Sequence, residues 1–180
     1  MINEFTIRPK PTNQNAKIAF LSCISIFAFL IITYRVSELY KGVIGLFAII
    51  FLTVAILFYT KYISAYYTYE VTHTSDDVPM FVVRQRIGKR ISTLSAVRLR
   101  DISNVVYQTA EEKRAYTTEP GFLKYNHLPT LMPKGTILIT VRTRYEKSEI
   151  RIEGTVELAE ILKEYAGVAK AMLPPDEDDE

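Results

Sequence analysis

The amino-acid sequence predicts an α+β protein, in which a two-helix transmembrane hairpin is followed by a mainly antiparallel β domain that is capped by a C-terminal α-helix. Three observations lead to this class. Two long apolar runs without charged residues lie near the start of the 180-residue chain, and short runs with alternating apolar and polar side chains follow them. One amphipathic helical pattern comes last, and such a helix can cover the apolar face of a sheet.

The two apolar runs are Ile18–Tyr34 and Gly42–Thr60, and neither contains Asp, Glu, Lys, Arg or His. As α-helices they would be about 26 and 28 Å long, close to the ~30 Å hydrocarbon core of a bilayer. A helix satisfies its own backbone polar groups in lipid, so both runs are predicted to span a membrane. The alternative is a pair of core helices in a soluble protein, and it is disfavoured because Phe47–Phe58 is apolar all the way round.

Cationic and tyrosine side chains border both runs, as they border membrane helices. A long cationic side chain can reach the headgroups from a helix end, and a tyrosine can place its ring in lipid and its hydroxyl in water. The flanking residues are Lys17, Arg35, Lys41 and Lys61, with Tyr34, Tyr40, Tyr59, Tyr62, Tyr66 and Tyr67. A cleaved signal peptide is a further alternative for the first run, but the run does not end in a small-residue cleavage site.

The short connection between the runs makes an antiparallel hairpin and places both termini on one side of the membrane. On that side the flanks carry Arg8, Lys10, Lys17 and Lys61. The connection carries only Arg35 and Lys41. This cation bias predicts a two-pass protein of the cell (cytoplasmic) membrane with cytoplasmic N- and C-termini. The single cysteine, Cys23, excludes an intramolecular disulfide and agrees with that side.

From Tyr66 to Gly154 the sequence consists of short runs that are rich in β-branched and aromatic residues, as in strands. Gly88 lies between two of these runs and predicts a tight hairpin turn, because glycine adopts the positive φ that such turns need. Val97–Arg100 and Ile102–Gln108 are expected to form one or two strands. The other expected strands are Tyr67–His73, Met80–Arg86, Arg90–Leu94, Thr136–Thr143 and Ser148–Glu153.

The longest irregular stretch is Ala110–Lys134, with a short strand expected at Phe122–Tyr125. A loop of this length in a small domain is usually functional or mobile. Its apolar residues make it a candidate partner-binding loop, and they are Phe122, Tyr125 and Leu131.

A C-terminal helix is predicted from apolar residues with i, i+3, i+4, i+7 spacing, which lie on one helix face. These residues are Leu158, Ile161, Leu162, Tyr165, Ala169 and Met172. Thr155 is the expected N-cap, and Pro174–Pro175 is expected to end the helix. The last residues, Asp176–Glu180, are too highly charged to pack.

A resemblance to a known family rests on three segments, Tyr66–His73, Phe81–Arg90 and Val97–Val105. In this order they resemble the bacterial pleckstrin-homology-like (PH-like) membrane proteins, in which one or two spans precede a small seven-stranded partial barrel capped by a C-terminal helix. The long loop before Thr136 departs from a minimal version of that fold. The resemblance covers residues 66–173 and implies an assembly or interaction module, because family members share a fold and no catalytic residue.

The chain is accordingly divided into four parts. Residues 1–17 form an N-terminal cytoplasmic segment, and residues 18–61 form the transmembrane hairpin. Residues 66–173 form the PH-like β domain with its helix, and residues 174–180 form an acidic disordered tail.

Sequence motifs for catalysis, metal binding and nucleotide binding are absent. The histidines are His73 and His127, the cysteine is Cys23, and none has the spacing of a metal site. A P-loop, a GxSxG elbow and a GxGxxG fingerprint are also missing. The spans lack the ionisable groups of a transporter, and the net charge of +2 gives no basis for nucleic-acid binding. We therefore expect neither an enzyme nor a bound cofactor or metal.

Basic residues are concentrated within positions 84–100 of the predicted sheet. They are Arg84, Arg86, Lys89, Arg90, Arg98 and Arg100. Each cation near an anionic leaflet contributes about 1 kcal/mol, so this hairpin is a candidate for headgroup or partner binding. Arg84, Arg86 and Arg90 share a sheet face if the hairpin register allows it. The alternative interpretation is a solvated strand face whose cations protect a sheet edge.

The leading functional hypothesis is a membrane-anchored interaction or scaffold protein, whose cytosolic domain binds a protein partner or a second copy of itself. The binding surface is expected to be the candidate loop or an exposed sheet edge that accepts a partner strand. The runner-up is recognition of anionic lipid headgroups by the basic hairpin 84–100. The lipid bilayer is a partner in both hypotheses.

Overall fold

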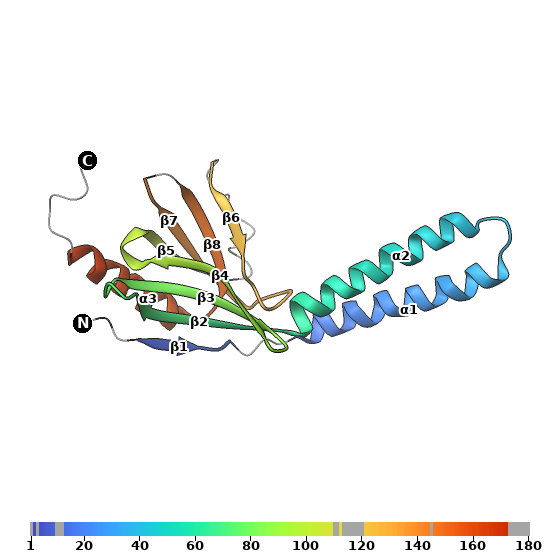
Figure 1. Cartoon of the computed structure of the whole chain (residues 1–180), viewed down its shortest axis with the longest axis horizontal. Helices are drawn as coiled ribbons and strands as arrows, with labels where there is room; N and C mark the ends of the chain where they lie inside the picture. Colours follow the sequence, from blue (N-terminus) through green and yellow to red (C-terminus); the bar gives the residue numbers. More distant parts are fainter. Residues whose placement is uncertain are drawn as a thin grey trace. The chain divides into compact units, whose positions relative to one another are not determined.

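The structure is a computed structural model, and it describes residues 2, 4–9, 13–109, 112, 121–144 and 146–172. The chain forms two compact units. The helical unit is Pro11–Ala65, and the β unit combines Met1–Lys10 with Tyr66–Glu180. The helical unit is therefore inserted after the first strand of the β unit (Figure 1).

Two apolar helices, α1 (Gln14–Val36) and α2 (Lys41–Phe58), pack against each other in the helical unit, and a π-helical turn, η1 (Tyr59–Ile63), continues α2. Both predicted spans fall on them. The helical segments Gln14–Val36 and Lys41–Ile63 have 23 residues each, which corresponds to about 35 Å. They are long and apolar enough to cross a membrane, and are two candidate membrane-spanning helices.

Most of the apolar surface of these helices is not buried within the protein. Only 6% and 11% of the residues in the two most apolar windows are buried. Large side chains such as Phe29 and Ile49 are exposed, whereas Ala48 and Ala55 are buried. Ala48 and Ala55 are seven residues apart and so share one face of α2. Small residues of this kind allow two helix backbones to approach closely.

The first sheet contains β1 (Phe5–Ile7), β2 (Ala65–His73), β3 (Pro79–Ile87) and β4 (Arg90–Arg98), in the order β1-β2-β3-β4. Side chains alternate on β2, where Tyr67, Tyr69 and Val71 are buried and Tyr66 is exposed. β1 was not expected from the sequence. It pairs antiparallel with β2, with Phe5 opposite Val71, so the N-terminal segment belongs to the β unit.

The β3–β4 hairpin turns at Gly88, as the sequence predicts. Gly88 has a φ of +59° and occupies the first of the two turn positions, which is where a type II′ turn needs glycine. The strand expected at Val97–Arg100 is not separate. β4 continues to Arg98, and a 3₁₀ turn, η2 (Leu99–Asp101), leads to the next strand.

The second sheet contains β5 (Ile102–Thr109), β6 (Leu123–Asn126), β7 (Gly135–Arg142) and β8 (Lys147–Glu153), in the order β5-β7-β8-β6. Its other pairs are antiparallel, but β6 runs parallel to β8. β6 overlaps the short strand expected inside the long loop. Among the described strands, no pairing joins the two sheets into a closed barrel.

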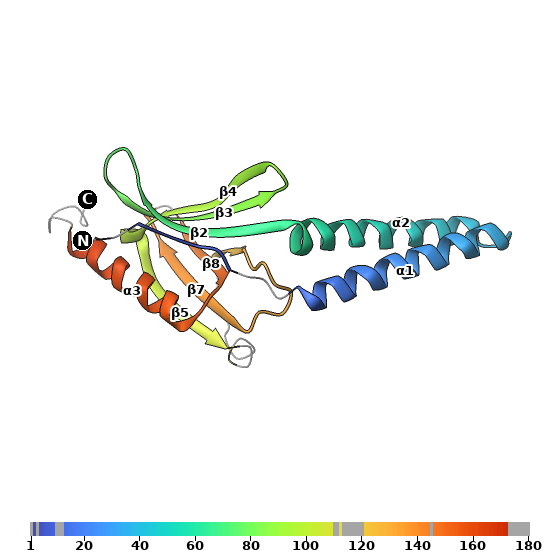
Figure 2. The same cartoon turned by 90° about the horizontal axis from the view of Figure 1, so that it is seen from below.

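The C-terminal helix, α3 (Val156–Ala171), contacts β5 and η2 (Figure 2). Its N-cap is Thr155, whose Oγ1 accepts a hydrogen bond from the Leu158 backbone N–H at 3.5 Å. The predicted apolar face is buried at Leu158, Leu162 and Ala169. Tyr165 is half-buried, and Ile161 and Met172 are exposed. The expected proline stop and acidic tail lie outside the described residues.

Candidate binding surfaces of the β unit

The structure separates the basic residues of positions 84–100 into two groups at opposite ends of β4. Arg84, Arg86, Lys89 and Arg90 lie at the hairpin end. Arg98 and Arg100 lie at and beyond the other end. An extended strand from Arg90 to Arg98 spans about 26 Å, so one small ligand cannot contact both groups. The six residues therefore do not form one patch.

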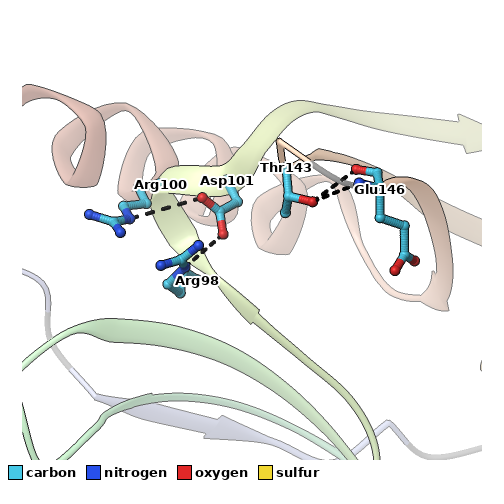
Figure 3. Close-up of polar contacts among 5 residues, drawn as sticks. All are labelled: Arg98, Arg100, Asp101, Thr143 and Glu146. Atoms are coloured by element: carbon cyan, nitrogen blue, oxygen red, sulfur yellow. Dashed lines mark hydrogen bonds and ion pairs between the residues drawn. The ribbon is translucent and has the colours of Figure 1, made fainter. Parts of the chain in front are cut away.

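Asp101 neutralises much of the charge at the far end of β4. Arg98 Nε donates a hydrogen bond to Asp101 Oδ2 at 2.8 Å, and Arg100 Nε lies 3.9 Å from Asp101 Oδ1 (Figure 3). Nearby, the β7–β8 turn is held by three hydrogen bonds between Thr143 and Glu146, one of which runs from the Thr143 backbone N–H to Glu146 O at 2.9 Å. Thr143 Oγ1 donates to Glu146 O at 3.1 Å and accepts from Glu146 N–H at 3.0 Å. Both arrangements are local structural contacts.

The hairpin register decides which basic side chains share a face. Residues that are directly opposite on two strands point to the same side. Arg86 is opposite Ile91 and Ile87 is opposite Arg90, so Arg90 faces away from Arg86. The expectation that Arg84, Arg86 and Arg90 share one face is therefore wrong for Arg90. Arg84 and Arg86, two positions apart on β3, do share a face.

A cleft of about 460 Å³ lies on the face of the first sheet that carries Arg84 and Arg86. We call it the outer-face cleft, and its lining includes Arg8, Pro9, Tyr66, Thr68, Glu70, Arg84, Gln85, Arg86, Gly88 and Ile91. Arg84 Nη1 lies 3.2 Å from Glu70 Oε2, and Arg86 Nε donates to Gly88 O at 2.9 Å. Arg8 was not a candidate in the sequence, because its position depends on the pairing of β1 with β2.

A second concave surface follows the free edge of β4. Of the described strands, only β3 pairs with β4. A hollow of about 260 Å³ lies between the other edge of β4 and the second sheet. A neighbouring hollow of about 390 Å³ shares Ala96, Val97 and Thr143 with it and extends past Arg98 to Thr74, Asp76, Val78 and Met80. We call them the edge groove. Its remaining lining includes Leu94, Ser95 and Arg98 on β4, with Tyr125, Val141, Glu146, Ser148 and Ile150 opposite.

Of the three predicted partner-loop residues, all of which the structure describes, Tyr125 lines the edge groove. Its hydroxyl donates a hydrogen bond to Glu146 Oε1 at 3.3 Å, and its ring stacks on His127 with centroids 6.3 Å apart. His127 Nε2 lies 2.7 Å from Ser95 Oγ on β4. Phe122 instead lies under the Arg142 guanidinium, 5.8 Å from the ring centroid. Leu131 is half-buried.

The described residues contain no group of three or more His, Cys, Asp or Glu side chains that is placed to hold a metal ion. The chain matches no protein-family model, and no curated protein matches it. The features that bear on function are the two candidate spans, the outer-face cleft and the edge groove.

Proposed function

We propose that this chain is a two-pass protein of the cytoplasmic membrane, whose PH-like β unit binds a protein partner or a second copy of the chain in the cytoplasm. The role is binding rather than catalysis. Two apolar helices, whose inner runs Ile18–Tyr34 and Gly42–Thr60 carry no charged residue, support the membrane location. The excess of flanking cations on the terminal side supports the orientation. Two sheets followed by one C-terminal helix form an element order that is compatible with a PH-like unit.

The observation that carries the proposal is the edge of β4 beside the edge groove, with which none of the described strands pairs. A strand edge presents backbone N–H and C=O groups that an extended peptide can pair with, and hollows beside the edge accommodate alternate side chains of that peptide. Ala96 is exposed at the centre of the groove and has too small a side chain to block it. Tyr125, 38% exposed, supplies an aromatic contact on the opposite side.

A photo-crosslinker in the groove tests this function. We place p-benzoyl-phenylalanine at Tyr125 in the full-length protein and irradiate intact membranes. The expected result is a discrete adduct, which Ala96→Lys abolishes because a long charged side chain fills the groove. Adducts at twice the 20.6 kDa chain mass identify self-association, and other masses identify a different protein.

The control is Thr93→Lys, which places the same side chain at an exposed position of β4 that does not line the groove. This variant should retain the adduct. A crosslinking pattern that is identical in the Ala96→Lys and Thr93→Lys proteins would contradict strand addition at β4. Carbonate extraction of the same membranes checks the anchor separately, because a chain with two spans stays in the pellet.

Recognition of anionic lipid headgroups is the second candidate function. The observation that favours it is that Arg8 lines the outer-face cleft together with Arg84 and Arg86. Arg98 and Arg100 are excluded from such a site because they lie at the far end of β4 beside Asp101.

A further inference from the structure

The outer-face cleft brings together three arginines from two distant parts of the sequence. Arg84 and Arg86 come from β3, and Arg8 follows β1 immediately. The acidic side chain that lines the cleft is Glu70, opposite Thr6 in the β1–β2 register. Three cations against one carboxylate give the described lining a net positive charge. Such a lining favours an anionic ligand.

The arginine side chains retain donors for such a ligand. A guanidinium has five N–H donors in a fixed fork that matches a phosphate or carboxylate group. Arg86 Nε donates a hydrogen bond to Gly88 O, which fixes the side chain and leaves its terminal nitrogens out of this bond. Glu70 contacts one terminal nitrogen of Arg84 and orients it in the same way. The pair is therefore held in position, whereas the Arg8 side chain is on the exposed border.

The chain connects this cleft closely to both candidate spans. Tyr66 lines the cleft and comes three residues after Ile63, where the second helical segment ends. Pro9 also lines the cleft, and it lies five residues before Gln14, where the first helical segment begins. At no more than ~3.6 Å per residue, these connections reach about 11 and 18 Å. Tyr66 and Ile91, both more than 60% exposed, add the amphipathic and apolar side chains common at a membrane surface.

We propose that the outer-face cleft binds the phosphate group of an anionic lipid headgroup, through Arg8, Arg84 and Arg86. This inference rests on the proposed membrane location and is independent of partner binding in the edge groove. The ligand chemistry is a phosphate ester, which a bilayer lipid or a soluble phosphate ester can supply. The sequence alone predicts a basic site between positions 84 and 100. The proposed site keeps Arg84 and Arg86, leaves out Arg98 and Arg100, and adds Arg8.

Native mass spectrometry of the full-length, detergent-released protein tests the site with three probes: phosphatidylglycerol, phosphatidylcholine and free glycerol phosphate. We expect phosphatidylglycerol to bind more tightly than phosphatidylcholine. The Arg8→Gln and Arg86→Gln pair should weaken phosphatidylglycerol binding about fivefold for each arginine removed. Binding of glycerol phosphate with the same arginine dependence supports the phosphate chemistry and identifies a soluble source.

The matched control is Arg90→Gln, which removes the same charge from the same hairpin but on the opposite face. It should leave phosphatidylglycerol binding within a factor of about two, since a surface cation outside the site adds little at moderate salt. Arg90→Gln is compared with Arg86→Gln made as a single variant, and equal losses in these two proteins overturn the proposal. Equal binding of the two lipids to the unmodified protein also overturns it. If the double variant does not fold, phosphatidylglycerol binding by the Arg8→Gln single variant is compared with that of Arg90→Gln instead.

The outcome is distinguishable from failure of the proposed function. Arg8→Gln with Arg86→Gln should leave the Tyr125 crosslink and resistance to carbonate extraction unchanged. A protein that loses lipid selectivity but keeps both of these has lost the cleft alone. A protein released by carbonate contradicts the membrane location itself.

Discussion

Glu153 is a half-buried residue at the end of β8, and the folded structure disfavours the charged form of its carboxyl group. Burial raises the pKa of Glu153, and hydrogen bonding by Thr130 offsets only part of that rise. The Oε2 atom of Glu153 is buried without a hydrogen-bond partner among the described residues. Its backbone N–H donates to the hydroxyl of Tyr69 at 3.2 Å. Tyr69 is fully buried on β2, and burial raises its pKa as well. This contact joins the two sheets at the cost of placing a carboxylate close to the core.

Glu153→Gln is expected to stabilise the fold in a pH-dependent way. The pKa of Glu153 in the folded protein lies above its unfolded value of about 4.3. Between these two pKa values the folded state binds more protons than the unfolded state. The unmodified protein therefore loses stability as the pH rises through this range. The advantage of the variant should therefore be absent below about pH 4 and grow toward neutral pH. Thermal unfolding of the detergent-solubilised protein at a series of pH values measures it.

Glu157 is a control of opposite sign. Hydrogen bonding to the N-cap Thr155 lowers the pKa of Glu157. Glu157→Gln should therefore destabilise the fold at neutral pH, and the difference should disappear as pH falls through the folded pKa. A stability gain of Glu153→Gln that does not vary with pH would show that charge is not its cause.

At the scale of the elements, two glycines make contrasting predictions about packing. A Cβ at Gly135, the first residue of β7, would lie 2.7 Å from Tyr107 Cζ on β5. Gly135→Ala should therefore reduce the free energy of unfolding by about 1–3 kcal/mol, since the ring must move. Gly167 in α3 is exposed with nothing within 4 Å of an added Cβ, so Gly167→Ala should add about 0.5–1 kcal/mol. Chemical denaturation measures the free energy of unfolding of both variants. Equal changes in Gly135→Ala and Gly167→Ala would contradict the packing of Tyr107 against Gly135.

The elements that sequence predicts well have strong local signals. The apolar helices follow from runs without charges, the β3–β4 turn from Gly88, and α3 from Thr155 and its apolar spacing. β1 has only three residues, too few for an alternation to be seen, and its partner Val71 lies far along the chain. The parallel pairing of β6 with β8 is likewise non-local, and strand periodicity contains no information about it.

The candidate surfaces were predicted in part for the same reason. Sequence identified Arg84, Arg86 and Tyr125 because their residue types are informative by themselves. It missed Arg8, whose place beside β3 requires β1 to pair with β2. It also groups Arg98 with the hairpin, because closeness in sequence does not show that β4 continues to Arg98 and carries this residue to the far end of the strand.

At the scale of the whole molecule, β1 pairs with β2 although the helical unit lies between them in sequence. Strands of one sheet must lie on one side of a membrane, so the N-terminal segment and the β unit share a compartment. In a Cys23→Ser background we introduce Thr6→Cys on β1, Ser75→Cys in the β2–β3 turn and Leu39→Cys between the helices. All three positions are exposed.

An impermeant maleimide applied to intact cells should label Leu39→Cys alone, whereas Thr6→Cys and Ser75→Cys should need permeabilised cells. Labelling of Ser75→Cys and not Leu39→Cys from outside would reverse the proposed orientation. Labelling of Thr6→Cys and Ser75→Cys from different sides would be incompatible with the β1–β2 pairing.

The separation of β1 from β2 also sets an order for biogenesis. Thr6 leaves the ribosome well before Glu70, its partner in the register. Synthesis proceeds from the N-terminus, so the nascent first strand has no neighbour until both apolar helices have been translated. Pairing of β1 with β2 therefore has to follow translation of both apolar helices, and a bulky fusion at the N-terminus would have to stay beside β1 until its neighbour emerges.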